Sequence, residues 1–145
     1  MNIFVVEDPY SWGMREHIQN MLSDIPGVEV IGHVQYDEPD VIKRGDELSP
    51  DIVIFNVSNQ NKSIIYFLRG IKERYASIKI MALSNYTDRC YEDCCMRIGV
   101  NYFFDKAFFD KSSKSMRVRA FMRIRAALWH FVNTCILNDR FVTLQ

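Results

Sequence analysis

Short apolar runs alternate with longer amphipathic segments from one end of the chain to the other. Five of these runs have the length and the β-branched or aromatic content of buried strands, and they lie at residues 2–6, 28–34, 51–55, 78–83 and 101–104. Apolar residues at helical spacing follow each run and predict helices at residues 12–23, 39–48, 63–75, 87–98 and 113–132. The alternation predicts an α/β protein with a flavodoxin-like (βα)5 doubly wound fold. Its five-stranded parallel sheet would have the order 2-1-3-4-5 and carry helices on both faces.

Helical spacing also indicates which side chains the helices bury. The predicted helix at residues 39–48 contains Gly45 near its middle, where glycine costs about 1 kcal/mol relative to alanine, so this helix is expected to be short or mobile. For three other helices the predicted inner side chains are Met14, Ile18, Met21 and Leu22, then Ile64, Phe67, Leu68 and Ile71, then Val118, Phe121, Met122, Trp129 and Val132.

The composition is that of an ordinary globular domain. The chain has 145 residues, of which 48% are hydrophobic and 25% charged. Lys+Arg and Asp+Glu both number 18, so the net charge attracts the molecule neither to nucleic acid nor to a membrane surface. No apolar run approaches the roughly 20 residues of a membrane-spanning helix, and the N-terminus lacks the pattern of a secretion signal. A cytoplasmic location is therefore expected.

The four cysteines, Cys90, Cys94, Cys95 and Cys135, do not have the spacing of a disulfide framework. Cys90 and Cys94 are four residues apart, as in some metal sites, but no histidine lies near them in the sequence. They are interpreted as reduced thiols in a reducing compartment, with a redox sensor as the alternative.

Polar side chains follow four of the predicted strands where each strand ends. Glu7 and Asp8 end the first strand, Asn56 the third, Ser84 the fourth, and Lys106 follows the fifth. The carboxyl ends of parallel strands meet at one edge of a doubly wound sheet, where ligand groups gather. These side chains are therefore expected to lie close together.

Four segments in this order, FVVEDPY, PDIVIFNVS, KIMALSNYTD and GVNYFFDKAFF, resemble the receiver domains of two-component response regulators over residues 1–128. The resemblance places Asn56 at the position of the phosphoacceptor aspartate and Phe103 at that of the switch aromatic. Two departures stand out: Ala107 replaces a frequent proline, and the loop at residues 57–62 lacks the usual proline and glycine. The resemblance implies a receiver-like domain at residues 1–133, followed by a tail at residues 134–145.

In receiver domains the acidic pair and the acceptor aspartate hold Mg²⁺. The resemblance therefore implies that Glu7, Asp8 and the Ser58 backbone carbonyl offer at most a weak Mg²⁺ site, because one of three carboxylates is replaced. Ser84 and Lys106 would contact phosphoryl oxygens. An amide nitrogen has a delocalised lone pair and forms no acyl phosphate, so Asn56 is not expected to accept a phosphoryl group. The acidic pair is expected to pair with Lys106, with residual metal or anion binding as the alternative.

The segment at residues 111–125 is locally basic, with six cations and no acid. Its predicted inner face leaves Arg119 and Arg123 pointing outward, four residues apart. They form either a solvated face or a surface that meets acidic residues such as Glu92 and Asp93 on a second copy. Nucleic acid is a weaker candidate partner, because no recognisable binding motif is present.

Two functions remain open from the sequence. The first is an atypical receiver domain, not an enzyme, that acts by contact with a histidine kinase, another regulator or an output protein. It would need no cofactor. The second is a flavodoxin-like domain that senses a small ligand or anion at the same strand-end pocket. Against the second, the first strand is followed by Glu7-Asp8-Pro9-Tyr10 rather than a glycine-rich phosphate loop.

Overall fold

Two compact units make up the chain, Met1–Lys106 and Ala107–Gln145. The computed structural model describes residues 1–8, 14–36, 41–57, 62–84 and 89–105 of the first unit. In the second unit it describes residues 122–123, 126–128 and 130. The predicted boundary at residues 133 and 134, Cys135, and the predicted residues Ser58, Lys106 and Arg119 lie outside these ranges.

The first unit is built on a five-stranded parallel sheet of order β2-β1-β3-β4-β5, which confirms the predicted topology. At their carboxyl ends the strands extend one or two residues beyond the predicted runs, and four of the five begin one residue later. Glu7, Asn56 and Ser84 are therefore paired within the sheet and do not lie in the loops beyond it. The strands are β1 (Asn2–Glu7), β2 (Glu29–Gln35), β3 (Ile52–Val57), β4 (Lys79–Ser84) and β5 (Tyr102–Asp105).

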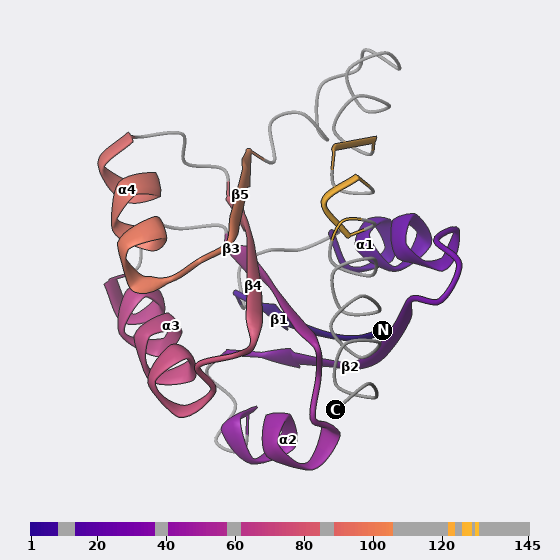
Figure 1. Ribbon diagram of the computed structural model, residues 1–145, viewed down its shortest axis with the longest axis horizontal. Coiled ribbons are helices and arrows are strands. Elements are labelled where there is room, and N and C mark those ends of the chain that lie inside the picture. The colour runs from indigo at the N-terminus through magenta and orange to yellow at the C-terminus, as the bar shows by residue number, and fades with distance from the viewer. Residues whose placement is uncertain are drawn as a thin grey trace, which may run out of the picture. The chain divides into compact units, whose positions relative to one another are not determined.

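Four helices of this unit are described: α1 (Met14–Ser23), α2 (Val41–Leu48), α3 (Lys62–Arg74) and α4 (Arg89–Ile98). Figure 1 shows α3 and α4 on one side of the sheet and α1 on the other. The helix α2 spans eight residues with Gly45 inside it, and the residue after its last residue, Ser49, has a φ of 46°. The Ser49 amide donates to the Gly45 carbonyl at 3.0 Å, so Ser49 forms an αL C-cap of the helix.

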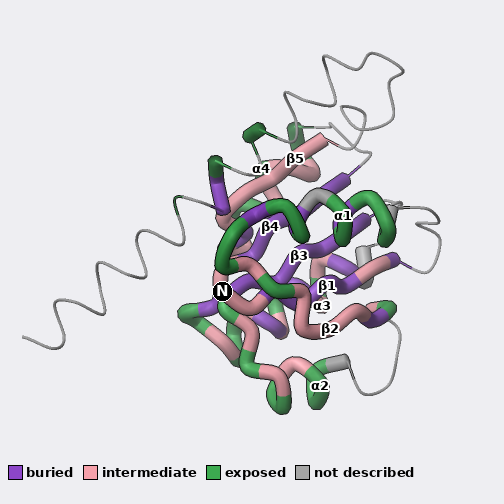
Figure 2. The backbone as a smooth tube through the Cα atoms, turned by 90° about the vertical axis from the view of Figure 1, so that its right-hand side faces the viewer, coloured by how far each residue is buried: buried purple, intermediate pink, exposed green. Residues whose placement is uncertain are grey.

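Both faces of the sheet are buried, so its central strands read as continuous apolar runs. In Figure 2 the buried stretches lie along the strands, and exposed stretches lie on the outer turns of α1 and α2. Each buried Val, Leu, Ile or Phe contributes about 1.5–3 kcal/mol of transfer free energy. The core on the α3–α4 face includes Phe4, Val6, Val53, Phe55, Val57, Ile64, Leu68, Ile71, Ile80, Ala82 and Cys95.

A β-bulge in β2 alters which residues share a face. Ile3 is paired with Val30 but Phe4 with Gly32, so Ile31 is an additional residue. Gly32 fits this position because it has no side chain. A Cβ there would lie 2.9 Å from the Phe4 ring and 2.8 Å from Leu48. Because strand side chains alternate, a one-residue shift moves every later residue of β2 to the other face.

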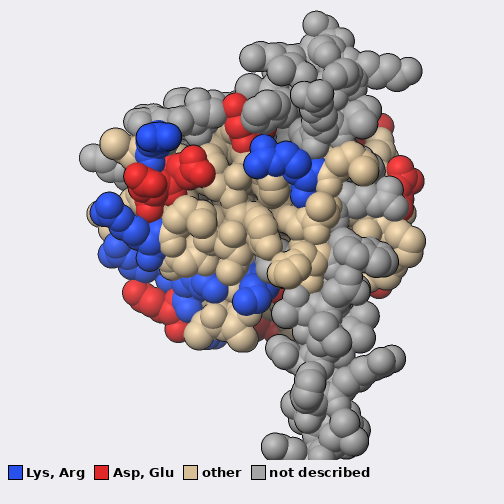
Figure 3. Space-filling model, turned by 45° about the horizontal axis from the view of Figure 1, so that its top comes forward, with Lys and Arg blue, Asp and Glu red and all other residues tan. Residues whose placement is uncertain are grey.

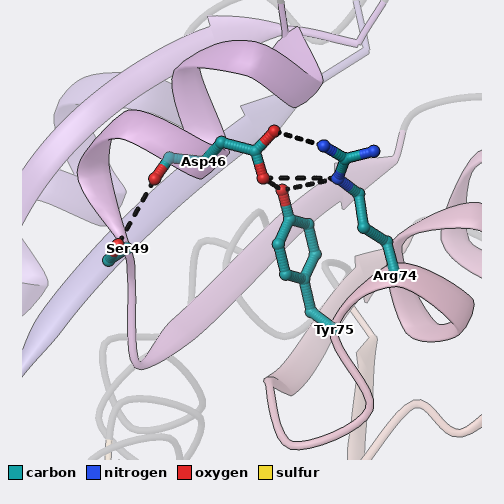
Figure 4. A network of polar contacts seen from close by, with 4 residues as sticks. All are labelled: Asp46, Ser49, Arg74 and Tyr75. Carbon is teal, nitrogen blue, oxygen red and sulfur yellow. Dashed lines mark hydrogen bonds and ion pairs between the residues drawn. The ribbon is translucent and has the colours of Figure 1, made fainter.

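A polar cluster joins the ends of α2 and α3 (Figure 4). Nη2 of Arg74 lies 2.6 Å from Oδ2 of Asp46, and the Tyr75 hydroxyl also donates to the Asp46 carboxylate. The hydrogen bond to Asp46 raises the pKa of Arg74. The Arg74 and Asp46 side chains are 56% and 37% exposed, so water competes for both partners. We call these three residues the surface cluster.

In the second unit, the described residues are helical. Ala127 and Leu128 are buried, whereas Met122 is 55% exposed, so the prediction that Met122 faces a core is wrong. The prediction rested on spacing alone, which gives the period of a buried face but not its position around the helix. Arg123 is exposed. No helix in the described part of the chain is long and apolar enough to cross a membrane.

Candidate functional site

Glu7 and Asn56 are in contact at the carboxyl ends of β1 and β3. They are paired in register, so their side chains leave the sheet on the same face. Nδ2 of Asn56 donates to Oε1 of Glu7 at 3.3 Å, and Asn56 is only 1% exposed. The reverse amide orientation would turn the Asn56 oxygen toward a carboxylate. The contact therefore fixes the amide with its NH₂ group toward Glu7.

His33 is the third member of this site, and the sequence did not indicate it. Its Nε2 lies 3.2 Å from Oε1 of Glu7, and the two side chains are 13% and 12% exposed. The distance suits an ion pair, although the geometry is not that of a hydrogen bond. Because of the bulge, His33 is paired with Val5 and shares the face of Glu7. We call Glu7, His33 and Asn56 the strand-end cluster.

Asp8 and Ser84 are buried at the same edge of the sheet, with 3% and 0% exposure. The Asp8 amide donates to the Asn56 carbonyl at 2.9 Å, which continues the ladder past Glu7. Burial raises the pKa of the Tyr91 phenol, and nearby Cys95, Cys94 and the Asp8 carboxylate add to the shift. The Asp8 carboxylate is therefore near α4, whereas the Glu7 carboxylate contacts β2.

Phe103 lies half-buried on β5, where its ring packs edge-on against Tyr91 of α4 with centroids 6.1 Å apart. On the same helix Glu92 is half-buried and Asp93 exposed. Figure 3 shows acidic and basic side chains in small adjacent groups over the face it presents, without one large field of a single sign among the coloured residues.

The arrangement does not suit the Mg²⁺ ion that receiver domains hold. Mg²⁺ prefers anionic oxygens, but Asn56 presents an NH₂ donor to Glu7 and the same Glu7 oxygen also contacts His33. Among the described residues, no group of three or more His, Cys, Asp or Glu is placed to hold a metal ion. Within the described ranges, the contacts of the Glu7 carboxylate are to the side-chain nitrogens of Asn56 and His33.

A small cavity of about 210 Å³ opens beside the strand-end cluster, between α1 and the bulged part of β2. Its polar lining groups are Arg15, Gln19 and His33, and the remainder is apolar or glycine. His33 therefore borders this cavity and also contacts Glu7, which links the cavity to the strand-end cluster.

No protein-family model matches the chain, and no curated protein is similar in sequence. Solved structures do match. The response regulator domain of Thermotoga maritima CheB superimposes with a TM-score of 0.65 at 20% identity, covering 92% of this chain and 94% of that chain. A LuxR-family response regulator from Aurantimonas sp. SI85-9A1 gives 0.65 at 20% identity, over 87% of this chain and 85% of that chain.

The signal receiver domain of NarL from Mycobacterium tuberculosis gives a TM-score of 0.61 at 16% identity, over 86% of this chain and 95% of that chain. The fold of this chain is therefore the flavodoxin-like fold of response regulator receiver domains. This agrees with the resemblance seen in the sequence.

Proposed function

We propose that the chain is an atypical receiver domain of two-component signal transduction that does not accept a phosphoryl group and acts by protein–protein contact. One observation carries the proposal. Within a receiver fold, the second-last residue of β3 is a buried amide, Asn56, which donates to Glu7 instead of presenting a carboxylate.

Phosphoryl transfer to a receiver requires a nucleophilic carboxylate. The Asn56 amide is neutral and its NH₂ group is directed to Glu7 at 3.3 Å, so it offers no nucleophile at that position. Asn56 Nδ2 and His33 Nε2 both contact the same Glu7 oxygen, Oε1, which Mg²⁺ would need as a ligand. We therefore infer that Mg²⁺ binding at Glu7 and Asp8 is weak.

A receiver fold without phosphorylation still has surfaces that partners bind, and a partner shifts its conformation if it prefers one state. A signalling protein is the proposed partner, that is, a histidine kinase, another regulator or an output protein. We propose a cytoplasmic location and no enzymatic activity. Cys94 and Cys95 are free thiols, as a reducing compartment would leave them.

The test compares the wild-type chain with Asn56→Asp. Both are incubated with acetyl phosphate and Mg²⁺, and their intact masses are measured. We expect a phosphoryl adduct on Asn56→Asp alone, because this change restores the nucleophile. An adduct on the wild-type chain that maps to the strand-end residues would refute the proposal.

Self-association is a separate proposal. Asp93 on α4 and Arg123 in the second unit are both exposed and opposite in charge. Two copies could therefore pair through Glu92 and Asp93 of one and Arg119 and Arg123 of the other. Sedimentation velocity at low and high salt tests this pairing, because attraction between exposed charges weakens with ionic strength. A dimer that is insensitive to salt would exclude charge pairing.

A second candidate function, the sensing of a small ligand, is favoured by the cavity that His33 borders. Apolar walls with a few convergent polar groups are typical of ligand sites. A ligand that moved the His33 ring would also change its contact with Glu7. A thermal-shift series with acetate, benzoate and AMP separates the two functions. Saturable stabilisation that is lost in Arg15→Ala favours sensing, and its absence favours the adaptor.

A further inference from the structure

A groove of about 550 Å³ lies between α3 and α4, which are neighbours on one side of the sheet (Figure 1). Each helix contributes residues at positions i, i+3 and i+4, which form one stripe of a helix surface. Three of the lining side chains are cationic and one is acidic. They are Arg69, Lys72 and Glu73 of α3 and Cys94, Arg97 and Ile98 of α4.

Neither arginine of the groove, Arg69 or Arg97, forms an ion pair within the described part of the chain. Arg74, five residues after Arg69, is paired with Asp46. A guanidinium group presents a planar fork of donors that matches a carboxylate in a bidentate arrangement. The groove therefore carries two donor forks with unused capacity, one on each helix.

Lys72 adds a positive charge whose position is fixed. Its Nζ donates to the carbonyls of Ile78 at 2.8 Å and Ala76 at 3.3 Å. Its stem covers Gly99, where a Cβ would lie only 2.9 Å from Lys72 Cε. Burial, and after it the nearby Lys79, lowers the pKa of Lys72. The charge at this end of the groove is held by the fold.

The remainder of the groove is suited to a peptide more than to an inorganic ion. Cys94 and Ile98 are half-buried and supply an apolar floor. Tyr66 is 69% exposed and lies one turn before Arg69 on α3. Tyr and Arg are the residue types over-represented in the energetic centres of protein interfaces. The volume also far exceeds that of a single oxyanion, and the arginines lie on different helices.

We propose that the α3–α4 groove binds an acidic peptide segment of a partner protein. Carboxylates of that segment pair with Arg69 and Arg97, and an apolar side chain packs on Cys94 and Ile98. The groove is lined by α3 and α4 and by no residue of the strand-end cluster, and its role does not depend on whether the domain is phosphorylated. If the groove does not bind the peptide, the proposed function is unaffected. If the proposed function is refuted, the groove proposal is unaffected.

The probe for the test is a fluorescein-labelled decapeptide of glutamate with one central leucine. Its binding to the full chain is followed by fluorescence anisotropy at low salt. We expect saturable binding by the wild-type chain. Arg69→Glu combined with Arg97→Glu should reduce the affinity at least about tenfold, because the two groups that face the peptide carboxylates become negatively charged. Circular dichroism checks that the variant is folded.

The matched control is Lys43→Glu combined with Arg44→Glu on α2, which changes the net charge equally at two exposed positions outside the groove. We expect its affinity to stay within about twofold of the wild type. Equal losses in both double variants would show attraction by overall charge and overturn the proposal. Stronger competition by phosphate than by sodium chloride of equal ionic strength would overturn it in favour of a small-anion site.

A second measurement locates the peptide. The probe is given an activated aromatic disulfide at its centre, and a nearby protein thiolate displaces the aromatic thiol to form a mixed disulfide. Peptide mapping should find the adduct first on Cys94, which lines the groove, and not on the more exposed Cys90 of the same helix. Preferential reaction at Cys90 would contradict the proposed site. If the wild-type chain self-associates and the Arg69→Glu, Arg97→Glu variant does not, the groove binds a second copy of the chain. That result would also overturn the proposal.

Discussion

The strand-end cluster and the surface cluster each have one carboxylate contacted by two partners. Glu7 lies against Asn56 and His33, and its side chain is 12% exposed. Asp46 lies against Arg74 and Tyr75, and its side chain is 37% exposed. The surface cluster has the shorter contact, 2.6 Å against 3.2 and 3.3 Å. Contact distance alone would rank it as the stronger.

Burial reverses that ranking. An exposed ion pair contributes roughly 0–1 kcal/mol, since each member is well solvated when the pair opens. A buried polar group that loses its partner has no water to replace it, and the loss is about 1–3 kcal/mol or more if the group is charged. Disruption of the strand-end cluster, despite its longer contacts, is therefore expected to cost more stability than disruption of the surface cluster. Substitutions in both clusters test this.

The largest effect is expected for Asn56→Asp. It places a second carboxylate beside the half-buried Glu7, and the repulsion should lower the free energy of unfolding by about 3 kcal/mol at neutral pH without metal. Urea denaturation measures the loss, with Asn20→Asp on the exposed face of α1 as the control for added charge.

The pH dependence of Asn56→Asp has a definite sign. Repulsion raises the pKa of the carboxyl pair in the folded state, so the native state binds more protons than the unfolded chain. Stability relative to wild type should therefore recover as the pH falls toward the ordinary carboxyl range of about 4. Added Mg²⁺ should also restore it. Loss that is equal at all pH values would indicate a packing defect.

A smaller loss is expected for Gly32→Ala, which tests the bulge that brings His33 to Glu7. The added methyl group would lie under 3 Å from Phe4 and Leu48, so overpacking should cost about 1–3 kcal/mol. The control is Gly45→Ala in α2, where a Cβ meets nothing within 4 Å. That variant should gain about 0.5–1 kcal/mol through helix propensity. Losses of the same size in both variants would contradict the role of the close approach.

Removal of the imidazole is the next test. In His33→Leu, Glu7 retains the Asn56 contact alone, and the free energy of unfolding should fall by about 1–2 kcal/mol. The exposed His17 supplies the control His17→Leu, which should have a change near zero. Guanidinium denaturation compares the two. Identical midpoints would show that the His33 contact adds nothing to stability.

The smallest effect is expected for Asp46→Asn in the surface cluster. The variant keeps an acceptor for the Tyr75 hydroxyl and loses only the charge that faces Arg74. Its shift in unfolding midpoint should be smaller than that of His33→Leu and should vanish at high salt. A shift larger than that of the buried variants would invert the comparison.

The fold was predictable because strand and helix periods alternate along the whole first unit, and burial on both faces of the sheet leaves a strong apolar signal. Glu7 and Asn56 were predictable as neighbours for the same reason, since both end adjacent strands. His33 was not. A bulge depends on local packing at Ile31 and Gly32, and simple alternation would place His33 on the opposite face. The prediction for Met122 was wrong because helical spacing gives the period of an inner stripe and not its position around the helix.

The Glu7–Asn56 contact has a consequence for the history of this gene. Codons for asparagine and aspartate differ by a single base, so a carboxylate at position 56 is one mutational step away. The neighbours of Glu7 suit an amide, and the first carrier of that change would inherit a less stable protein. Selection for folding alone would therefore oppose the substitution, whatever a carboxylate at this position would do.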